Sequence, residues 1–127
     1  MDPSSALNEH QRMSNATHAA TPPVDPLKIS RCIHQAYHNQ RIEAVNDHEI
    51  RLSVMTESFP WHRHPYSDET FFCIDGELVI EFTDRQVALR AGEFLTVPKG
   101  VRHRTRPGGN RSVNVTFEKL DAETVFE

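Results

Sequence analysis

The sequence has no long hydrophobic run and no secretion signal. Apolar residues make up 37% of its 127 residues and charged residues 25%, and no stretch approaches the roughly 18 consecutive apolar residues that a membrane-spanning helix needs. The N-terminus lacks the basic start and apolar run of a signal peptide. We therefore expect a globular cytoplasmic protein with no membrane partner.

Cysteine is scarce, and the sequence has no excess of basic residues. The two cysteines, Cys32 and Cys73, form no C-x-x-C pair, so in a cytosolic chain we expect both to be small buried residues and not a disulfide. The formal net charge is −4 and the pI is about 6.0. Binding to phosphate groups requires clustered cations, so this charge balance argues against a nucleic-acid partner.

The length suits one domain with a tail. Residues 1–26 are rich in Ser, Asn, Ala, Thr and Pro and contain few bulky apolar groups, so they cannot bury enough surface to offset the entropy of ordering. We interpret residues 1–26 as a flexible arm and residues 27–127 as a single folded domain.

A short helix and then a hairpin are predicted at the start of this domain. Apolar residues recur at helical spacing behind Asp25-Pro26 and predict a helix of about three turns; they are Leu27, Ile29, Ile33 and Tyr37. Residues 41–45 and 48–55 alternate around Asn46-Asp47, which predicts a hairpin. Within it, Ile50, Leu52 and Val54 would face the core, while Arg51 and Ser53 would face outward.

Short strands separated by turns follow. Residues 69–74 and 77–83 flank Asp75-Gly76, a strong hairpin signal. Further strands are expected at 87–89, 94–97, 101–105 and 112–117, with chain breaks at 98–100 and 107–110. No helical pattern falls between them, which favours an all-β sandwich or barrel over a parallel α/β sheet.

A set of potential metal ligands lies within these strands. Side chains alternate between the two faces of a strand, so His62 and His64 share one face, with about 7 Å between their Cβ atoms. A turn then brings in Glu69, and His103 lies just beyond the corner at 98–100. The neighbouring Asp68 would point to the opposite face. Three nitrogens and one oxygen suit a divalent transition metal.

The segment with His62, His64 and Glu69 and the segment that ends at His103 match the two sequence motifs of the cupin superfamily. The chain resembles the small single-domain members of that superfamily. The first motif is His62-x-His64, Glu69 and Gly76, and the second runs from Gly92 through Pro98 and Gly100 to His103. The resemblance covers about residues 41–117. Thr56 stands where the first motif usually opens with Gly and Pro107 where the second often ends with Asn, but neither position supplies a ligand.

This resemblance implies an all-β double-stranded β-helix, a jelly-roll barrel with the metal inside one end. It also implies a homodimer formed by sheet augmentation or face-to-face packing, in which residues 69–74 would take part. The expected cofactor is one divalent transition metal, Zn, Ni, Fe, Mn or Cu, held by His62, His64, Glu69 and His103. The expected substrate-pocket residues are Tyr66, Phe71, Cys73, Phe82 and Thr105.

The function expected is that of a metal-dependent enzyme acting on a small polar organic molecule, for which a carboxylate is one option. An octahedral ion with four protein ligands keeps two positions for substrate, water or dioxygen, and can act as a Lewis acid. Isomerisation or epimerisation, lyase chemistry and dioxygenation are candidate reactions, because fold does not select among them. The alternative is a non-catalytic metal- or ligand-binding module with a sensing or structural role.

A local cationic set has two interpretations. It consists of Lys99, Arg102, Arg104, Arg106 and Arg111. Alternation from His103 places Arg102, Arg104 and Arg106 on the outer face, which favours a solvated surface or a subunit contact. If the strand curves toward the barrel mouth, one arginine could instead bind a substrate carboxylate through two hydrogen bonds.

Overall fold

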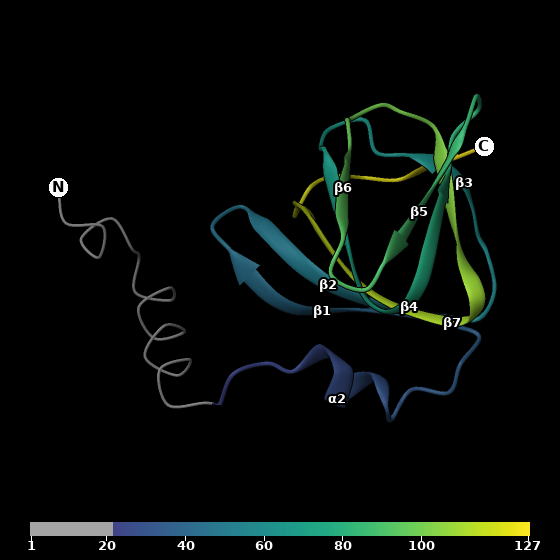
Figure 1. Cartoon of the computed structure of the whole chain (residues 1–127). Helices are drawn as coiled ribbons and strands as arrows, with labels where there is room; N and C mark the ends of the chain where they lie inside the picture. Colours follow the sequence, from purple (N-terminus) through teal and green to yellow (C-terminus); the bar gives the residue numbers. More distant parts are fainter. Residues whose placement is uncertain (1–21) are drawn as a thin grey trace, which may run out of the picture.

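The computed structural model describes residues 22–127, which form a jelly-roll barrel with one short helix (Figure 1). The elements are α2 (Pro26–Ser30), β1 (Tyr37–Val45), β2 (His48–Met55), β3 (Phe59–Arg63), β4 (Glu69–Glu81), β5 (Gln86–Arg90), β6 (Phe94–Val97), β7 (His103–Lys119) and β8 (Val125–Phe126). The predicted all-β class and jelly-roll architecture are confirmed. Of the predicted arm, the part up to position 21 lies outside the described residues. No helix in the described range is long and apolar enough to cross a membrane.

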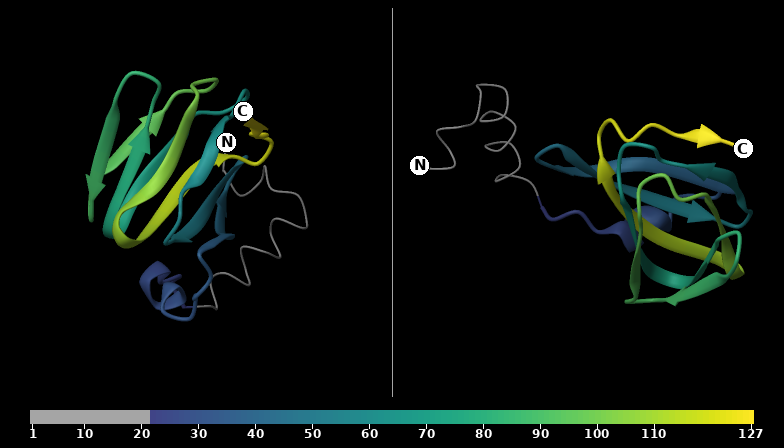
Figure 2. Two further views of the ribbon diagram at one scale, coloured as in Figure 1. Left: turned by 90° about the vertical axis from the view of Figure 1, so that its right-hand side faces the viewer. Right: turned by 90° about the horizontal axis from the view of Figure 1, so that it is seen from above.

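Two long strands hold the barrel together. One path through the sheet runs β1-β2-β7-β3-β8, and β4 pairs with β5, β6 and β7. All the pairs are antiparallel, and β4 and β7 run beside each other from Thr70↔Phe117 to Glu81↔Arg104. In both views of Figure 2 the strands curve around a shared interior. Distant parts of the sequence therefore meet inside one barrel.

The predicted β1–β2 hairpin is confirmed. Val45 pairs with His48 across a turn in which Asn46 has a φ of 53°. Asn tolerates this left-handed conformation better than most residues, so the local sequence was sufficient to place the turn.

The hairpin predicted at Asp75-Gly76 is wrong, because β4 continues through both residues. The register with β7 shifts between Cys73 and Asp75 and again between Gly76 and Leu78, so this is an irregularity within a continuous strand. Gly76 has a φ of 74°, which suits a bulge as well as a tight turn. The Asp75-Gly76 dipeptide indicates a residue with positive φ, but it does not distinguish a hairpin turn from a bulge.

The break predicted at residues 107–110 is also wrong, since β7 runs unbroken from His103 to Lys119. Its pairing with β3 is at Thr105 and His103, and its pairing with β2 begins at Ser112. Between these two regions the recorded partners of β7 are in β4, opposite Arg106 and Pro107. Pro and Gly are tolerated at such edge-like positions, because one side of the backbone needs no partner there.

Two apolar layers lie on opposite faces of the sheet. The inner layer lies inside the barrel and comprises Met55, Phe71, Cys73, Leu78, Ile80, Leu89 and Val97. The outer layer is built from Ile33, Leu52, Val54, Val113 and Val115, with Ile29 packed against it. Figure 1 shows α2 on the outer side of β1. The sheet is therefore buried on both faces where the N-terminal segment covers it.

This arrangement corrects the orientation predicted for β2. Leu52 and Val54 are fully buried as expected, but in the outer layer. Arg51 and Ser53, which were predicted to face outward, instead line a cavity inside the barrel. Alternation separates the two faces of a strand, but it does not show which face is internal when both are covered.

The N-terminal helix is shorter than predicted, at five residues. Asp25 caps it by accepting a hydrogen bond from the Lys28 backbone nitrogen at 3.2 Å. Arg111 Nη2 donates to the carbonyl oxygens of Ser30, at 2.6 Å, and Ile33, at 3.2 Å. The chain therefore leaves the helix early and is tied to β7, and Tyr37 begins β1.

The cysteines and the surface differ from expectation in part. Cys73 is buried as predicted, whereas Cys32 is exposed, and both are free thiols.

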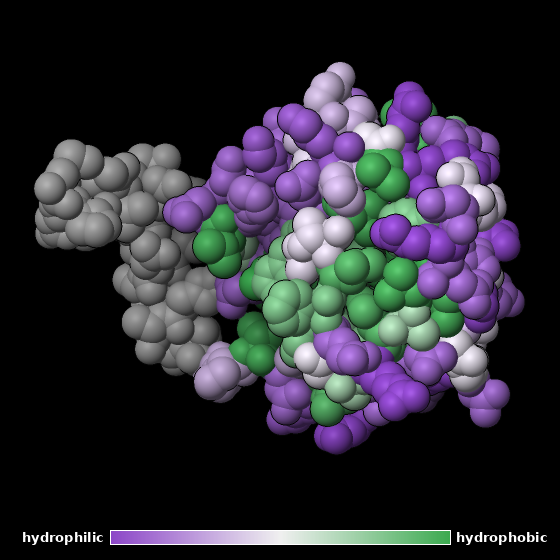
Figure 3. All heavy atoms as spheres, turned by 45° about the horizontal axis from the view of Figure 1, so that its top comes forward, coloured by the Kyte–Doolittle hydropathy of each residue, from purple (hydrophilic) through white to green (hydrophobic). Residues whose placement is uncertain are grey.

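Figure 3 shows apolar side chains gathered on the displayed face among hydrophilic ones. Large exposed apolar residues include Phe94, which is 69% exposed and lies at a tilted angle to Phe72, with 6.1 Å between the ring centroids. The homodimer stays a prediction.

Gly76→Ala should destabilise the fold. A Cβ at this position would lie 2.2 Å from the Arg111 carbonyl oxygen, and the φ of 74° disfavours a side chain. We expect the left-handed conformation alone to cost roughly 1–2 kcal/mol of unfolding free energy, with the backbone clash adding to it. Gly109→Ala is the matched control, because its Cβ would meet nothing within 4 Å. Equal stability of the two variants in urea titrations would contradict the bulge assignment.

Candidate metal centre

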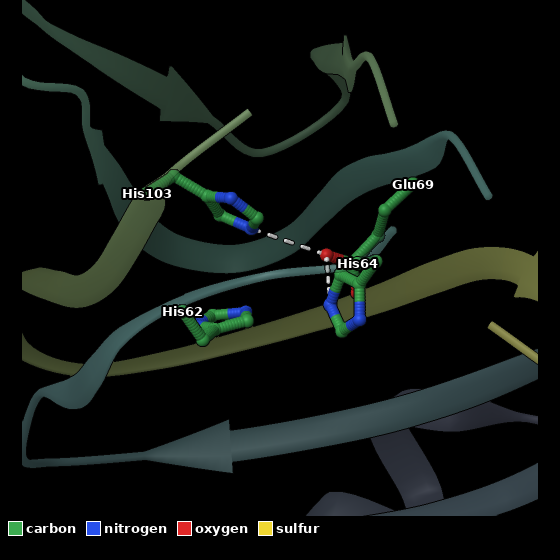
Figure 4. A group of neighbouring side chains, drawn as sticks. All are labelled: His62, His64, Glu69 and His103. Atoms are coloured by element: carbon green, nitrogen blue, oxygen red, sulfur yellow. Dashed lines mark hydrogen bonds and ion pairs between the residues drawn. The ribbon is translucent and has the colours of Figure 1, made fainter. Parts of the chain in front are cut away.

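Three strand ends bring four buried donor side chains together. His62 lies on β3 with His64 just beyond it, Glu69 begins β4, and His103 begins β7. Their exposed fractions are 3%, 7%, 6% and 1%, and one ligand atom from each lies within 4.8 Å of the others. In Figure 4 the four side chains point toward a common centre.

Backbone pairing sets this convergence. His62 and His103 are direct partners in the antiparallel β3–β7 pair, so their side chains point to the same face. The corner before β7 is held against the first motif, because the Gly100 backbone nitrogen donates to the His64 carbonyl oxygen at 2.8 Å. Asp68 strengthens the contact by accepting a hydrogen bond from the Lys99 backbone nitrogen at 2.9 Å.

Each imidazole is oriented by a backbone carbonyl that accepts a hydrogen bond from Nδ1. The pairs are His62 with Pro60 at 2.8 Å, His64 with Glu123 at 2.7 Å, and His103 with Val101 at 2.8 Å. A proton on Nδ1 leaves the Nε2 lone pair free in the neutral ring. Metal-binding histidines usually donate such a hydrogen bond from the ring nitrogen that does not bind the metal.

The donor set fits a divalent cation. Glu69 Oε1 lies 3.1 Å from His64 Nε2 and 3.3 Å from His103 Nε2. Both ring nitrogens therefore face the same carboxylate oxygen, and His103 Nε2 is within hydrogen-bond distance of it. A positive charge between these atoms, carried by a proton or a metal ion, offsets the charge of the carboxylate. Imidazole and carboxylate ligands in this ratio suit a transition metal.

Protons compete for the same atoms. Burial lowers the pKa of His62 to about 4, which keeps that ring neutral. Burial would also lower the pKa of His64, but hydrogen bonding and charge attraction to Glu69 outweigh burial and raise the pKa to about 9. Burial likewise acts to raise the pKa of Glu69, yet His103 and His64 hold it well below its usual range. A metal ion must therefore displace a proton from His64.

An open cavity of about 370 Å³ adjoins the cluster. His62, His64 and Glu69 form part of its lining, together with the predicted pocket residues Phe71 and Thr105. Three other predicted pocket residues lie elsewhere. Tyr66 is 59% exposed, Cys73 belongs to the inner apolar layer, and Phe82 lines a separate hollow with Trp61.

Sequence reasoning missed the polar lining contributed by β1, β2 and β7. These residues are Asn39, Glu49, Arg51, Ser53, Asn114, Thr116 and Glu118. A signal was present, because polar residues alternate strictly at 49, 51 and 53 and again at 114, 116 and 118. We assigned the polar face of β2 to solvent, whereas the barrel encloses it.

The arginines near His103 point away from the cavity lining. Arg102 stacks on Trp61, with 4.1 Å from its guanidinium carbon to the ring centroid, and Arg104 and Arg106 pair with Glu81. This matches the outward face that alternation predicted. The arginine in the cavity is Arg51.

Comparison with known proteins agrees with this architecture. The chain is 45% identical over 101 residues to the uncharacterized protein YdbB of Bacillus subtilis (strain 168), covering 79% of this chain and 88% of that protein. It is 39% identical over 62 residues to the tetracenomycin polyketide synthase protein TcmJ of Streptomyces glaucescens, covering 49% of this chain and 42% of that protein.

A solved structure shows the same fold. A cupin-2 domain protein from Shewanella frigidimarina NCIMB 400 superposes with a TM-score of 0.70 at 28% identity, covering 76% of this chain and 93% of that one. The family model described as "Cupin domain" matches residues 48–117, more than half of the chain, and spans all four clustered side chains. The chain therefore belongs to the cupin family.

Proposed function

We propose that this protein is a metal-dependent enzyme acting on a small polar organic molecule. His62, His64, Glu69 and His103 would hold one divalent transition metal, which is Zn, Ni, Fe, Mn or Cu. The observation that carries the proposal is the buried cluster of four donors beside an open cavity. Isomerisation or epimerisation, lyase chemistry and dioxygenation are the candidate reactions.

The position of the cluster favours an enzyme over a structural metal site. Structural sites are closed by their protein ligands, whereas catalytic sites keep a position open for water or substrate. Three of the four ligand residues line a cavity of about 370 Å³, a volume within the range of small-molecule sites. A ligand in the cavity would therefore lie beside the ion.

The protein residues and the metal have separate roles. A bound divalent ion supplies Lewis-acid polarisation of substrate oxygen atoms. The carbonyl groups of Pro60, Val101 and Glu123 keep the imidazoles in the ligating tautomer. Phe59 and Phe71 contribute apolar lining that limits the access of water around the bound molecule.

His64→Ala should lose most of the bound metal while the barrel stays folded. The substitution removes one of four donors and leaves the strands that carry the other three in place. Elemental analysis of untagged protein, with circular dichroism as the folding check, would measure this. His38→Ala is the matched control, because His38 Nε2 bonds to Gln40 at 2.8 Å and lies outside the cluster. Unchanged metal content in His64→Ala would remove the proposed site.

Metal binding should release close to one proton at pH 7. His64 has a pKa of about 9 in the metal-free protein, so it is protonated at neutral pH and must lose that proton to bind the ion. Apparent metal affinity should therefore rise with pH until about pH 9 and then level off. Titration calorimetry in two buffers of different ionisation enthalpy measures the proton count. An affinity that does not change between pH 7 and pH 9 would contradict this assignment.

The ion should also carry exchangeable water. With Mn²⁺ loaded as a paramagnetic probe, water-proton relaxation should be enhanced relative to a metal site closed by the protein. The enhancement should fall when a chelating ligand enters the cavity. A relaxation rate no higher than that of the metal-free protein would favour a closed structural site and count against catalysis.

A further inference from the structure

One wall of the cavity is polar and contains none of the four clustered ligands. It is defined here as the polar wall, formed by Asn39, Glu49, Arg51, Ser53, Asn114 and Glu118. Register explains its continuity, because Asn39 pairs with Ser53, Ser53 with Asn114, and Glu49 with Glu118 across β1, β2 and β7. These side chains consequently share the inner face of the sheet.

Two nitrogens of Arg51 and the amide nitrogen of Asn39 already donate hydrogen bonds within the polar wall. Arg51 donates from Nε to Asn39 Oδ1 and from Nη1 to Glu49 Oε1 at 3.0 Å. Asn39 Nδ2 in turn donates to Ser53 Oγ at 2.7 Å. A carboxylate held by two parallel hydrogen bonds needs two adjacent free N–H donors on one edge of a guanidinium group. On each of the two edges of Arg51 that could do this, one nitrogen already donates within the polar wall.

Two acceptors of the polar wall have no hydrogen bond, although Glu118 Oε2 lies 3.8 Å from His64 Nε2. Asn114 is 1% exposed and Glu118 is 9% exposed, and both belong to the lining. Asn114 Oδ1 and Glu118 Oε2 are buried without a hydrogen bond. Buried acceptors in folded proteins are nearly always satisfied, so these atoms indicate a missing donor.

The charge of the cavity lining also favours a ligand that donates hydrogen bonds and carries no negative charge. It contains the carboxylates of Glu49, Glu69, Glu118 and Glu123 and the basic side chains of Arg51 and Lys119, a formal charge of −2. A divalent ion offsets this charge. The loaded cavity is then close to neutral and has unpaired acceptors, conditions that disfavour an anion.

We propose that the polar wall binds hydroxyl groups of a neutral small molecule, with Asn114 and Glu118 accepting their hydrogen bonds. This inference rests on the proposed function, since it assigns the substrate class of the same cavity. It selects a neutral hydroxylated molecule over the carboxylate that the sequence left open. Selectivity follows because a ligand without the hydroxyl leaves both acceptors desolvated and unpaired.

A matched probe series tests the proposal in the protein loaded with Zn²⁺. The probes are four benzene-1,2-diols that differ only at carbon 4, which carries hydrogen, methyl, hydroxyl or carboxylate. We expect the hydroxyl probe to bind about fivefold more tightly than the methyl probe, the effect of one typical hydrogen bond. The carboxylate probe should bind more weakly than either. Titration calorimetry gives each dissociation constant.

Asn114→Leu should abolish the hydroxyl preference while leaving binding of the methyl probe intact. Ser112→Ala is the matched control, because Ser112 Oγ is also buried without a partner on β7 but lies outside the cavity lining. Glu118→Met provides a second variant if Asn114→Leu does not fold. A preference that survives both Asn114→Leu and Glu118→Met would overturn the proposal.

Metal content separates this inference from the proposed function. Tighter binding of the carboxylate probe by Zn²⁺-loaded protein, or no binding of any of the four probes, would overturn the hydroxyl site while the metal centre stands. If the protein holds no metal, the hydroxyl preference can still be measured in the metal-free protein. A preference lost in Asn114→Leu would then support the polar wall although the proposed function had failed.

Discussion

The antiparallel pairing of β3 with β7 is the constraint on which the candidate site depends. It makes His62 and His103 direct partners, although they are far apart in the sequence. The hydrogen bond between Gly100 and the His64 carbonyl oxygen then closes the corner over the first motif. Three imidazoles and one carboxylate therefore converge on one buried point. In the metal-free protein a proton on His64 faces Glu69, and a metal ion would take the place of that proton.

Covering both faces of the sheet is what makes a polar interior possible. The outer apolar layer, which includes the fully buried Leu52 and Val113, adds hydrophobic stabilisation to that of the inner layer. Arg111 ties the N-terminal segment over this layer. The inner face of β2 and β7 is therefore free to present polar side chains to a ligand. Stability and binding are divided between the two faces of the same strands.

Local signals in the sequence predicted backbone conformation better than they predicted which strands would pair with each residue. Asn46 placed a real turn because hairpins are closed by neighbouring residues. Gly76 also has the positive φ that its sequence implied, yet it lies in a bulge facing Arg111. Pro107 looked like a strand break, although β7 continues past it where one edge has no partner. Asn46 and Gly76 both have positive φ, whereas the pairing around Gly76 and Pro107 comes from strands distant in the sequence.

The sequence by itself determined the fold class, most strand positions and the four clustered donors, because alternation and motif spacing are properties of neighbouring residues. It also held the two polar stripes at 49–53 and 114–118. Only the tertiary structure decided that Arg51 and Asn114 face a cavity. Alternation divides a strand into two faces, and which face becomes the interior depends on how the sheet closes and on what covers its other side.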